Sequence, residues 1–162
     1  MLKKIMLSGL VAASAYAHSA NFEIYRPQLE SDVLCGSFPD TKVESHLKNL
    51  KDTGVLPSKS KISDDPADWE PIKAASGFTA FGLPITEILL FPGYRANPPH
   101  VALTIAATPQ AVVKAITAQY KTMDLKFKPS INGSFTSINK RKGFVLNISK
   151  QGAATTVSCD GS

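Results

Sequence analysis

Apolar residues recur at two different intervals along this chain, and the change of interval divides it into helices and strands. Val43, Leu47 and Leu50 are separated by four and three residues, which places them on one face of a helix. Gly54 is a typical stop signal just beyond that stripe. The pattern predicts a helix over residues 41–52.

Three short motifs are typical of helix starts. Thr41 and Glu44 have the spacing of a capping box, in which each side chain bonds the backbone N–H of the other residue. Asp-Pro at 65–66 and Thr-Pro at 108–109 each supply an N-cap followed by proline at the first helical position. These motifs predict a short turn of helix after residue 66 and a longer helix from 109 to about 121.

Strand patterns dominate the rest of the chain. Residues 85–91 and 101–106 are apolar and rich in β-formers, a proline-rich loop at 92–99 joins them, and a short strand is expected around 22–25. Asn-Gly at 132–133 is a strong hairpin signal. The carboxyl-terminal part therefore predicts a meander, with strands over 124–131, 134–138, 144–148 and 154–159 and turns at 140–143 and 151–152.

This order of elements predicts an α+β fold. Consecutive hairpins favour an antiparallel β-sheet, here of about five to six strands, with one or two helices packed on one face.

The amino-terminal seventeen residues have the three parts of a signal peptide. Residues 1–4 include two lysines, residues 5–15 carry no charge, and Ala-Tyr-Ala at 15–17 is a cleavage motif. Cleavage is expected before His18, with cleavage after Ser19 as the alternative. The protein would then be periplasmic or secreted.

An uncleaved membrane anchor is the other interpretation of this segment. Its apolar stretch is shorter than the ~20 residues that a spanning helix needs, which favours cleavage. Loss of residues 1–17 would leave residues 18–162, a length that can bury one hydrophobic core, so we expect a single compact α+β domain.

Cys35 and Cys159 are the two cysteines of the chain. An even number of cysteines in an oxidising compartment is typical of pairing, so the sequence predicts one disulfide between the early part of the exported chain and its last strand. Two unpaired buried thiols are the alternative. Closing so long a loop would stabilise the fold by about 4–5 kcal/mol at most.

Positive charge is concentrated toward the carboxyl terminus. The chain has 18 Lys+Arg against 13 Asp+Glu, and residues 101–162 contain eight basic residues with only Asp124 and Asp160 as acids. This surface could bind an anionic lipid, a glycan or an acidic protein, or it could be a solvated strand edge that lysines protect from pairing. The residues of this candidate surface are Lys126, Lys128, Lys140, Arg141 and Lys142. Side chains alternate along a strand, so Lys126 and Lys128 would share one face, beside the basic turn at 140–142.

The 92–99 loop is a second candidate contact surface. Tyr94 and Arg95 are of the residue types that dominate interface hot spots. The surrounding prolines would limit the entropy lost on binding. A merely rigid connection between two strands is the alternative.

No residue pattern assigns a catalytic or metal site. The run at 35–37 resembles the approach to a cysteine-protease nucleophile, but Phe38 stands where the reactive cysteine would be. His46 lies off the apolar stripe of its helix and has no partner at ligand spacing, so an exposed or structural role is expected. The acids at 64–70 lack the pattern of a calcium loop, and Glu87 is a lone acid in an apolar strand that most often points to solvent.

Together these features favour a binding protein that acts by surface recognition, such as an inhibitor or immunity-type protein against an envelope-targeting protein. One alternative is a module that binds anionic lipid or glycan through a basic sheet face. Another is a small hydrolase whose carboxylates only the fold brings together. No cofactor is expected, nucleic acid is disfavoured by the exported compartment, and the balance is against an enzyme.

Overall fold

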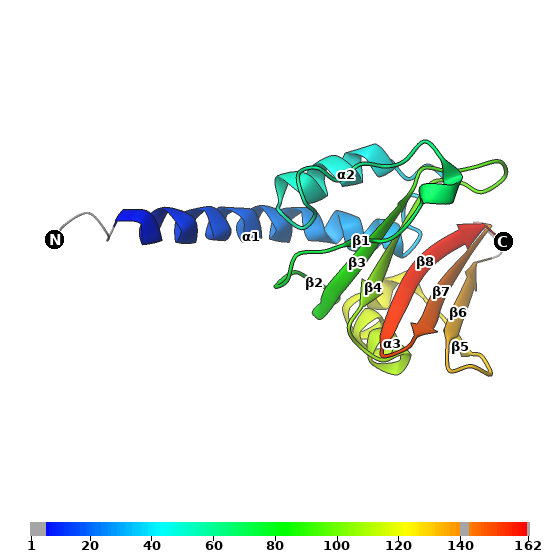
Figure 1. Ribbon diagram of the computed structural model, residues 1–162. Coiled ribbons are helices and arrows are strands. Elements are labelled where there is room, and N and C mark those ends of the chain that lie inside the picture. Colours follow the sequence, from blue (N-terminus) through cyan, green and yellow to red (C-terminus); the bar gives the residue numbers. More distant parts are fainter. Residues whose placement is uncertain (1–5, 140–142, 162) are drawn as a thin grey trace.

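A computed structural model describes residues 6–139 and 143–161 and shows an α+β fold built on an antiparallel sheet (Figure 1). Its helices are α1 (Met6–Val33), α2 (Val43–Asp52) and α3 (Pro109–Gln119), with short 3-10 turns η1 (Pro66–Asp68) and η2 (Lys121–Met123). Its strands are β1 (Ile72–Lys73), β2 (Thr79–Ala80), β3 (Leu83–Phe91), β4 (His100–Ile105), β5 (Lys128–Pro129), β6 (Phe135–Asn139), β7 (Phe144–Gln151) and β8 (Ala154–Gly161).

The strands form one eight-stranded sheet in the order β1-β3-β4-β8-β7-β6-β5, with β2 paired to β3. Every pair is antiparallel. The predicted fold class is therefore confirmed, with more strands than expected. The additional strands β1 and β2 have two residues each, too few to leave an alternating pattern in the sequence.

The short strand expected at 22–25 is wrong, because these residues belong to helix α1. Phe22, Tyr25, Leu29 and Val33 are separated by three, four and four residues, and all four are buried. Helix α1 packs on β4 and β8 in the middle of the sheet. A helix directs these four side chains to one face against the core, whereas a strand would direct Phe22 to the face opposite the other three.

The two halves of α1 lie in different surroundings. Figure 1 shows the amino-terminal half projecting away from the sheet, whereas the carboxyl-terminal half packs beside it. Among the residues that the structure describes, no helix combines the length and apolar character needed to cross a bilayer.

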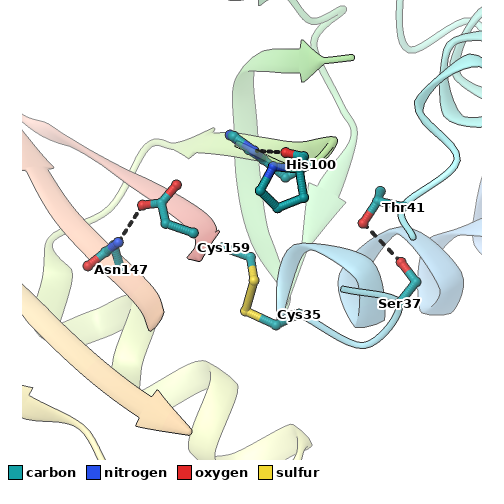
Figure 2. Close-up of a disulfide and its surroundings, with 8 residues drawn as sticks. Cys35, Ser37, Thr41, His100, Asn147 and Cys159 are labelled. Carbon is teal, nitrogen blue, oxygen red and sulfur yellow. Dashed lines mark hydrogen bonds between the residues drawn. A yellow bond between two sulfur atoms is a disulfide. The ribbon is translucent and has the colours of Figure 1, made fainter. Parts of the chain in front are cut away.

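The predicted helix near 41–52 is confirmed as α2, but its capping box is wrong. The N-cap is Lys42, which makes no side-chain cap bond. Thr41 is buried, and its hydroxyl lies 3.1 Å from the hydroxyl of Ser37 (Figure 2). The Thr41 hydroxyl is thus used to close the turn that precedes the helix.

The other two predicted helix starts are confirmed. The Asp65 carboxylate accepts a 2.9 Å hydrogen bond from the Ala67 N–H at the start of η1. The Thr108 hydroxyl accepts one of 3.3 Å from the Ala111 N–H at the start of α3.

The strand expected over 124–131 is reduced to β5. Asp124 follows η2 in the left-handed conformation, with φ 45°, and the chain pairs with β6 only from Lys128 onward. Lys126 therefore lies outside the strand. Lys126 and Lys128 are nevertheless exposed, and Phe127 between them packs against the core.

The remaining meander is confirmed. Asn-Gly at 132–133 lies in the connection between β5 and β6, where the Asn132 carboxamide oxygen accepts a bond from the Ser134 N–H. Residues 152–153 join β7 to β8. The basic turn expected at Lys140, Arg141 and Lys142 lies outside the described residues.

The predicted disulfide between Cys35 and Cys159 is confirmed, with the two Cα atoms 5.4 Å apart (Figure 2). It attaches the end of α1 to β8. The Gly36 N–H bonds the Ser31 carbonyl at 2.8 Å to close the helix. A Cβ at Gly36 would lie 2.7 Å from the Ser31 carbonyl oxygen, so glycine is what lets the chain turn tightly here.

Candidate functional site

The 92–99 loop connects β3 to β4 and holds a definite conformation. Tyr94 and Asn97 exchange two backbone hydrogen bonds, with donor–acceptor distances of 2.9 and 3.0 Å. These bonds close a tight turn that begins at Arg95. Because its backbone groups are paired, the loop is ordered before any partner binds.

The two ends of the loop approach each other closely at Gly93 and Pro99, which requires a glycine. Gly93 has φ 90°, and a Cβ at this position would lie 3.1 Å from Pro99 Cδ. Arg95 at the turn also has a positive φ, 55°, which is unfavourable for a residue with a side chain. Its guanidinium carbon lies 5.0 Å from the centre of the Tyr94 ring, within the range of a cation–π contact.

Aromatic rings brace this loop from behind. The Trp69 ring meets Phe91 and Tyr94 edge to face, with centroids 4.7 and 5.7 Å apart. The Trp69 indole N–H donates a 2.8 Å hydrogen bond to the Ser63 carbonyl. On the next strand, His100 stacks on Phe91 with centroids 4.6 Å apart. These contacts fix the position of Tyr94, whose residue remains 42% exposed.

Two hollows flank the loop. The larger, of about 470 Å³, separates the loop from α2 and the segment before η1; we call it the α2 groove. The smaller, of about 310 Å³, lies between the loop and the end of β8. The α2 groove is lined by Glu44, Leu47, Lys61, Ile62, Ser63, Asp64, Trp69, Pro92, Gly93 and Tyr94. A protruding Tyr–Arg pair with a hollow on each side can interlock with another macromolecule.

The predicted lysines lie elsewhere. Lys126 and Lys128 line a separate hollow of about 640 Å³ between the 123–128 segment and β6. Strands β8 and β7 separate β6 from β4, so these lysines do not join Tyr94 and Arg95. The expected contacts thus form two surfaces, as far as the described residues show.

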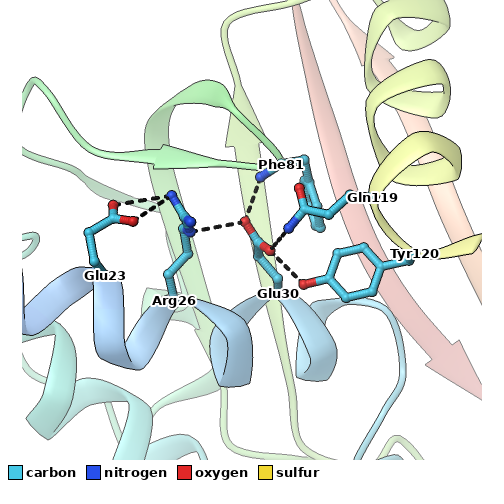
Figure 3. Close-up of polar contacts among 6 residues, drawn as sticks. All are labelled: Glu23, Arg26, Glu30, Phe81, Gln119 and Tyr120. Atoms are coloured by element: carbon cyan, nitrogen blue, oxygen red, sulfur yellow. Dashed lines mark hydrogen bonds and ion pairs between the residues drawn. The ribbon is translucent and has the colours of Figure 1, made fainter.

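A buried carboxylate cluster was missed by the sequence reasoning. Glu30 on α1 is 1% exposed and accepts bonds from the Phe81 N–H, the Gln119 amide and the Tyr120 hydroxyl, at 2.6, 2.6 and 2.5 Å (Figure 3). Arg26 Nε lies 3.7 Å from the same carboxylate. Burial, followed by the bond to Glu30, raises the pKa of Tyr120. The cluster joins α1 to α3 and leaves Glu30 no room to act on a substrate.

A second missed constellation joins α1 to α2. His46 is 1% exposed, its Nε2 lies 2.8 Å from Asp32 Oδ2, and its Nδ1 is bonded to the Tyr25 hydroxyl. Of the two roles expected for His46, the structure shows the structural one. Burial, followed by the charge of Asp32, raises the pKa of Tyr25. A protonated, buried hydroxyl is not a nucleophile, so the group acts as a structural tie.

The sequence contained one signal for both clusters. Tyr25, Arg26, Glu30 and Asp32 share helical spacing with the apolar face of α1, which a helix assignment for 22–25 would have revealed. No sequence signal connects Trp69 with Tyr94, because 24 positions and three strands separate them.

The remaining acids do not assemble into a metal site. Glu87 on β3 is half-buried, opposite Lys73 and Thr104 in the sheet register. Of the 64–70 acids, Asp64 lines the α2 groove. Within residues 6–139 and 143–161, no three histidine, cysteine or acidic side chains are grouped so that they could hold a metal ion.

Comparison of the chain with family models, with curated proteins and with solved structures found no match in any of the three.

Proposed function

We propose that this chain is an exported binding protein that recognises a protein partner through the 92–99 loop. The observation that carries the proposal is the presentation of Tyr94 and Arg95 on a turn closed by its own hydrogen bonds and braced by Trp69. An exposed aromatic–arginine pair held in advance is the arrangement that concentrates binding energy in protein interfaces. The flanking hollows would receive side chains of the partner.

Three features support export. The amino-terminal sequence has the parts of a signal peptide. The disulfide is of the kind that persists in oxidising compartments. Residues 19–21 are exposed and Phe22 is buried, so cleavage before His18 would leave the packed part of α1 intact.

We infer that the partner is an envelope or extracellular protein that this chain inhibits or neutralises. A partner surface that offers a carboxylate to Arg95 and an apolar contact to Tyr94 would complement the loop. Glu44, Lys61 and Asp64 on the α2 groove supply both signs of charge, which favours a mixed protein surface over a uniformly anionic ligand.

The test is a comparison of three immobilised proteins, exported by the producing cell and checked by intact mass for the expected cleavage. One is wild type, the second carries Tyr94→Ala and Arg95→Ala, and the third carries Ile24→Ala and Lys114→Ala. The third is a matched control, because it removes one exposed apolar and one exposed basic side chain from α1 and α3.

Each is exposed to envelope and culture extracts, and the affinity for any protein retained stoichiometrically is then measured. We expect the loop variant to bind at least about thirtyfold more weakly than wild type, as loss of roughly 2 kcal/mol at a hot spot requires, and the control to bind as wild type does. Equal binding by all three would remove the loop from the interface.

A further inference from the structure

We propose that the outer edge of β6 is a second binding site, which takes an extended acidic peptide segment as an additional strand. Strand β5 pairs with β6 through only two residues, Lys128 with Thr136 and Pro129 with Phe135. The remainder of β6 runs beside the 640 Å³ hollow that Lys126 and Lys128 line. A sheet edge next to an open hollow is the geometry used in β-strand addition.

The register identifies the backbone groups available at this edge. The Ser130 N–H bonds the Ser134 carbonyl at 2.8 Å, so Ser134 points toward β5. Backbone direction alternates along a strand, so Thr136 and Ile138 point the same way. Within the part of the chain that the structure describes, no strand pairs with Ile138 on that side. Its N–H and C=O are therefore directed into the hollow.

The side chains around the hollow indicate the chemistry of the ligand. Ile138 is 54% exposed and lines the hollow. Met123, Leu125 and Phe144 supply further apolar lining. The two lysines stand two positions apart on the opposite wall, where they can meet carboxylates at alternate positions of an extended chain.

The charge of the two lysines favours an acidic segment of another protein over a second copy of this chain. Antiparallel pairing of two β6 edges would bring the lysines of one copy near those of the other, which opposes self-association. Lys126 has a weak internal partner, Asp124, at 3.8 Å, and both side chains are more than 80% exposed. Such an exposed pair contributes little, so a carboxylate of the ligand can replace it. An acidic, alternating segment of another protein fits best.

The probe is a fluorescein-labelled peptide of alternating glutamate and valine, and binding is measured by fluorescence anisotropy. The deciding variant is Ile138→Pro, which removes the outward N–H together with the isoleucine side chain and is tolerated at a strand edge. Ile138→Ala is its matched control, because it removes the side chain and keeps the N–H. We expect Ile138→Pro to bind about tenfold more weakly than Ile138→Ala, consistent with loss of one backbone hydrogen bond.

A second readout does not depend on a variant. In wild type, hydrogen exchange of the Ile138 amide should slow at least about tenfold when the peptide is bound, because its N–H becomes hydrogen-bonded. The Tyr94→Ala, Arg95→Ala protein should bind the peptide as wild type does, which separates this site from the 92–99 loop.

Three results would overturn the proposal: equal affinity of Ile138→Pro and Ile138→Ala, unchanged binding of a peptide N-methylated at alternate residues, or an Ile138 amide whose exchange the peptide leaves unchanged. If vesicles of anionic phospholipid displaced the peptide equally from both variants, the lysines would be a simple charged patch, and strand pairing would likewise be rejected.

Discussion

The Glu30 cluster and the 92–99 loop contain similar side chains, but the cluster pairs them inside the fold and the loop presents them to solvent. The buried Glu30 carboxylate accepts a bond from the partly buried Tyr120 hydroxyl and lies 3.7 Å from Arg26 Nε. At the loop, an arginine and a tyrosine are held just as firmly, but by contacts behind them, and their polar groups face solvent.

The difference lies in where the hydrogen-bonding capacity is used. Groups that pair inside the fold have no capacity left for a ligand, and removing one leaves its neighbours buried without partners. Groups fixed from behind keep their polar atoms free, and removing one should affect binding far more than stability. The following predictions test this contrast, beginning with the largest effect.

Glu30→Ala should lower the free energy of unfolding by about 3–5 kcal/mol, because the buried Phe81 N–H, two partly buried side-chain donors and Arg26 lose the carboxylate. The matched control is Glu23→Ala, which removes the other carboxylate that Arg26 contacts, at 2.8 Å and half exposed. That change should cost less than about 1 kcal/mol. Urea denaturation of both variants would measure the difference, and similar losses would contradict the structural role given to Glu30.

Alkaline pH should destabilise the interior through Tyr25 and Tyr120. Their pKa values are raised by burial, whereas both tyrosines ionise near pH 10 in the unfolded chain. The unfolded state then binds fewer protons than the folded state, so stability falls as pH rises above about 10, by up to about 1.4 kcal/mol per pH unit for each tyrosine.

Urea titrations between about pH 9 and 11 would measure this slope. The variant with Tyr25→Phe and Tyr120→Phe should be less stable at neutral pH, yet its stability should fall less steeply over this range. An identical slope in the variant and in wild type would show that other groups cause the alkaline loss.

Arg95→Gly should have the smallest effect on stability. Glycine relieves the positive φ at this turn but makes the unfolded chain more flexible, so the free energy of unfolding should stay within about 1 kcal/mol of wild type. Arg95→Ala, which keeps the unfavourable conformation, serves as the comparison in the same urea titration. A loss of more than about 2 kcal/mol in either variant would place the loop among the groups that hold the fold together.

Helices and hairpins could be predicted from the sequence where their local pattern was long or chemically specific. The caps at Asp65 and Thr108 and the hairpin at Asn132 were predictable because each depends on two or three neighbouring residues. The capping box at Thr41 failed because the helix begins one residue later, after Lys42, and the turn before it uses the Thr41 hydroxyl.

By itself, the sequence determined the fold class, helices α2 and α3, most of the strands, the cysteine pair and the choice of Tyr94 and Arg95 as candidates, since these depend on local spacing and residue type. Only the tertiary structure decided that Glu30 and His46 are internal, that Trp69 braces Tyr94, and that β5 leaves part of β6 unpaired. Those outcomes depend on which distant segments meet, and the free energy of such contacts is set by burial in the assembled core.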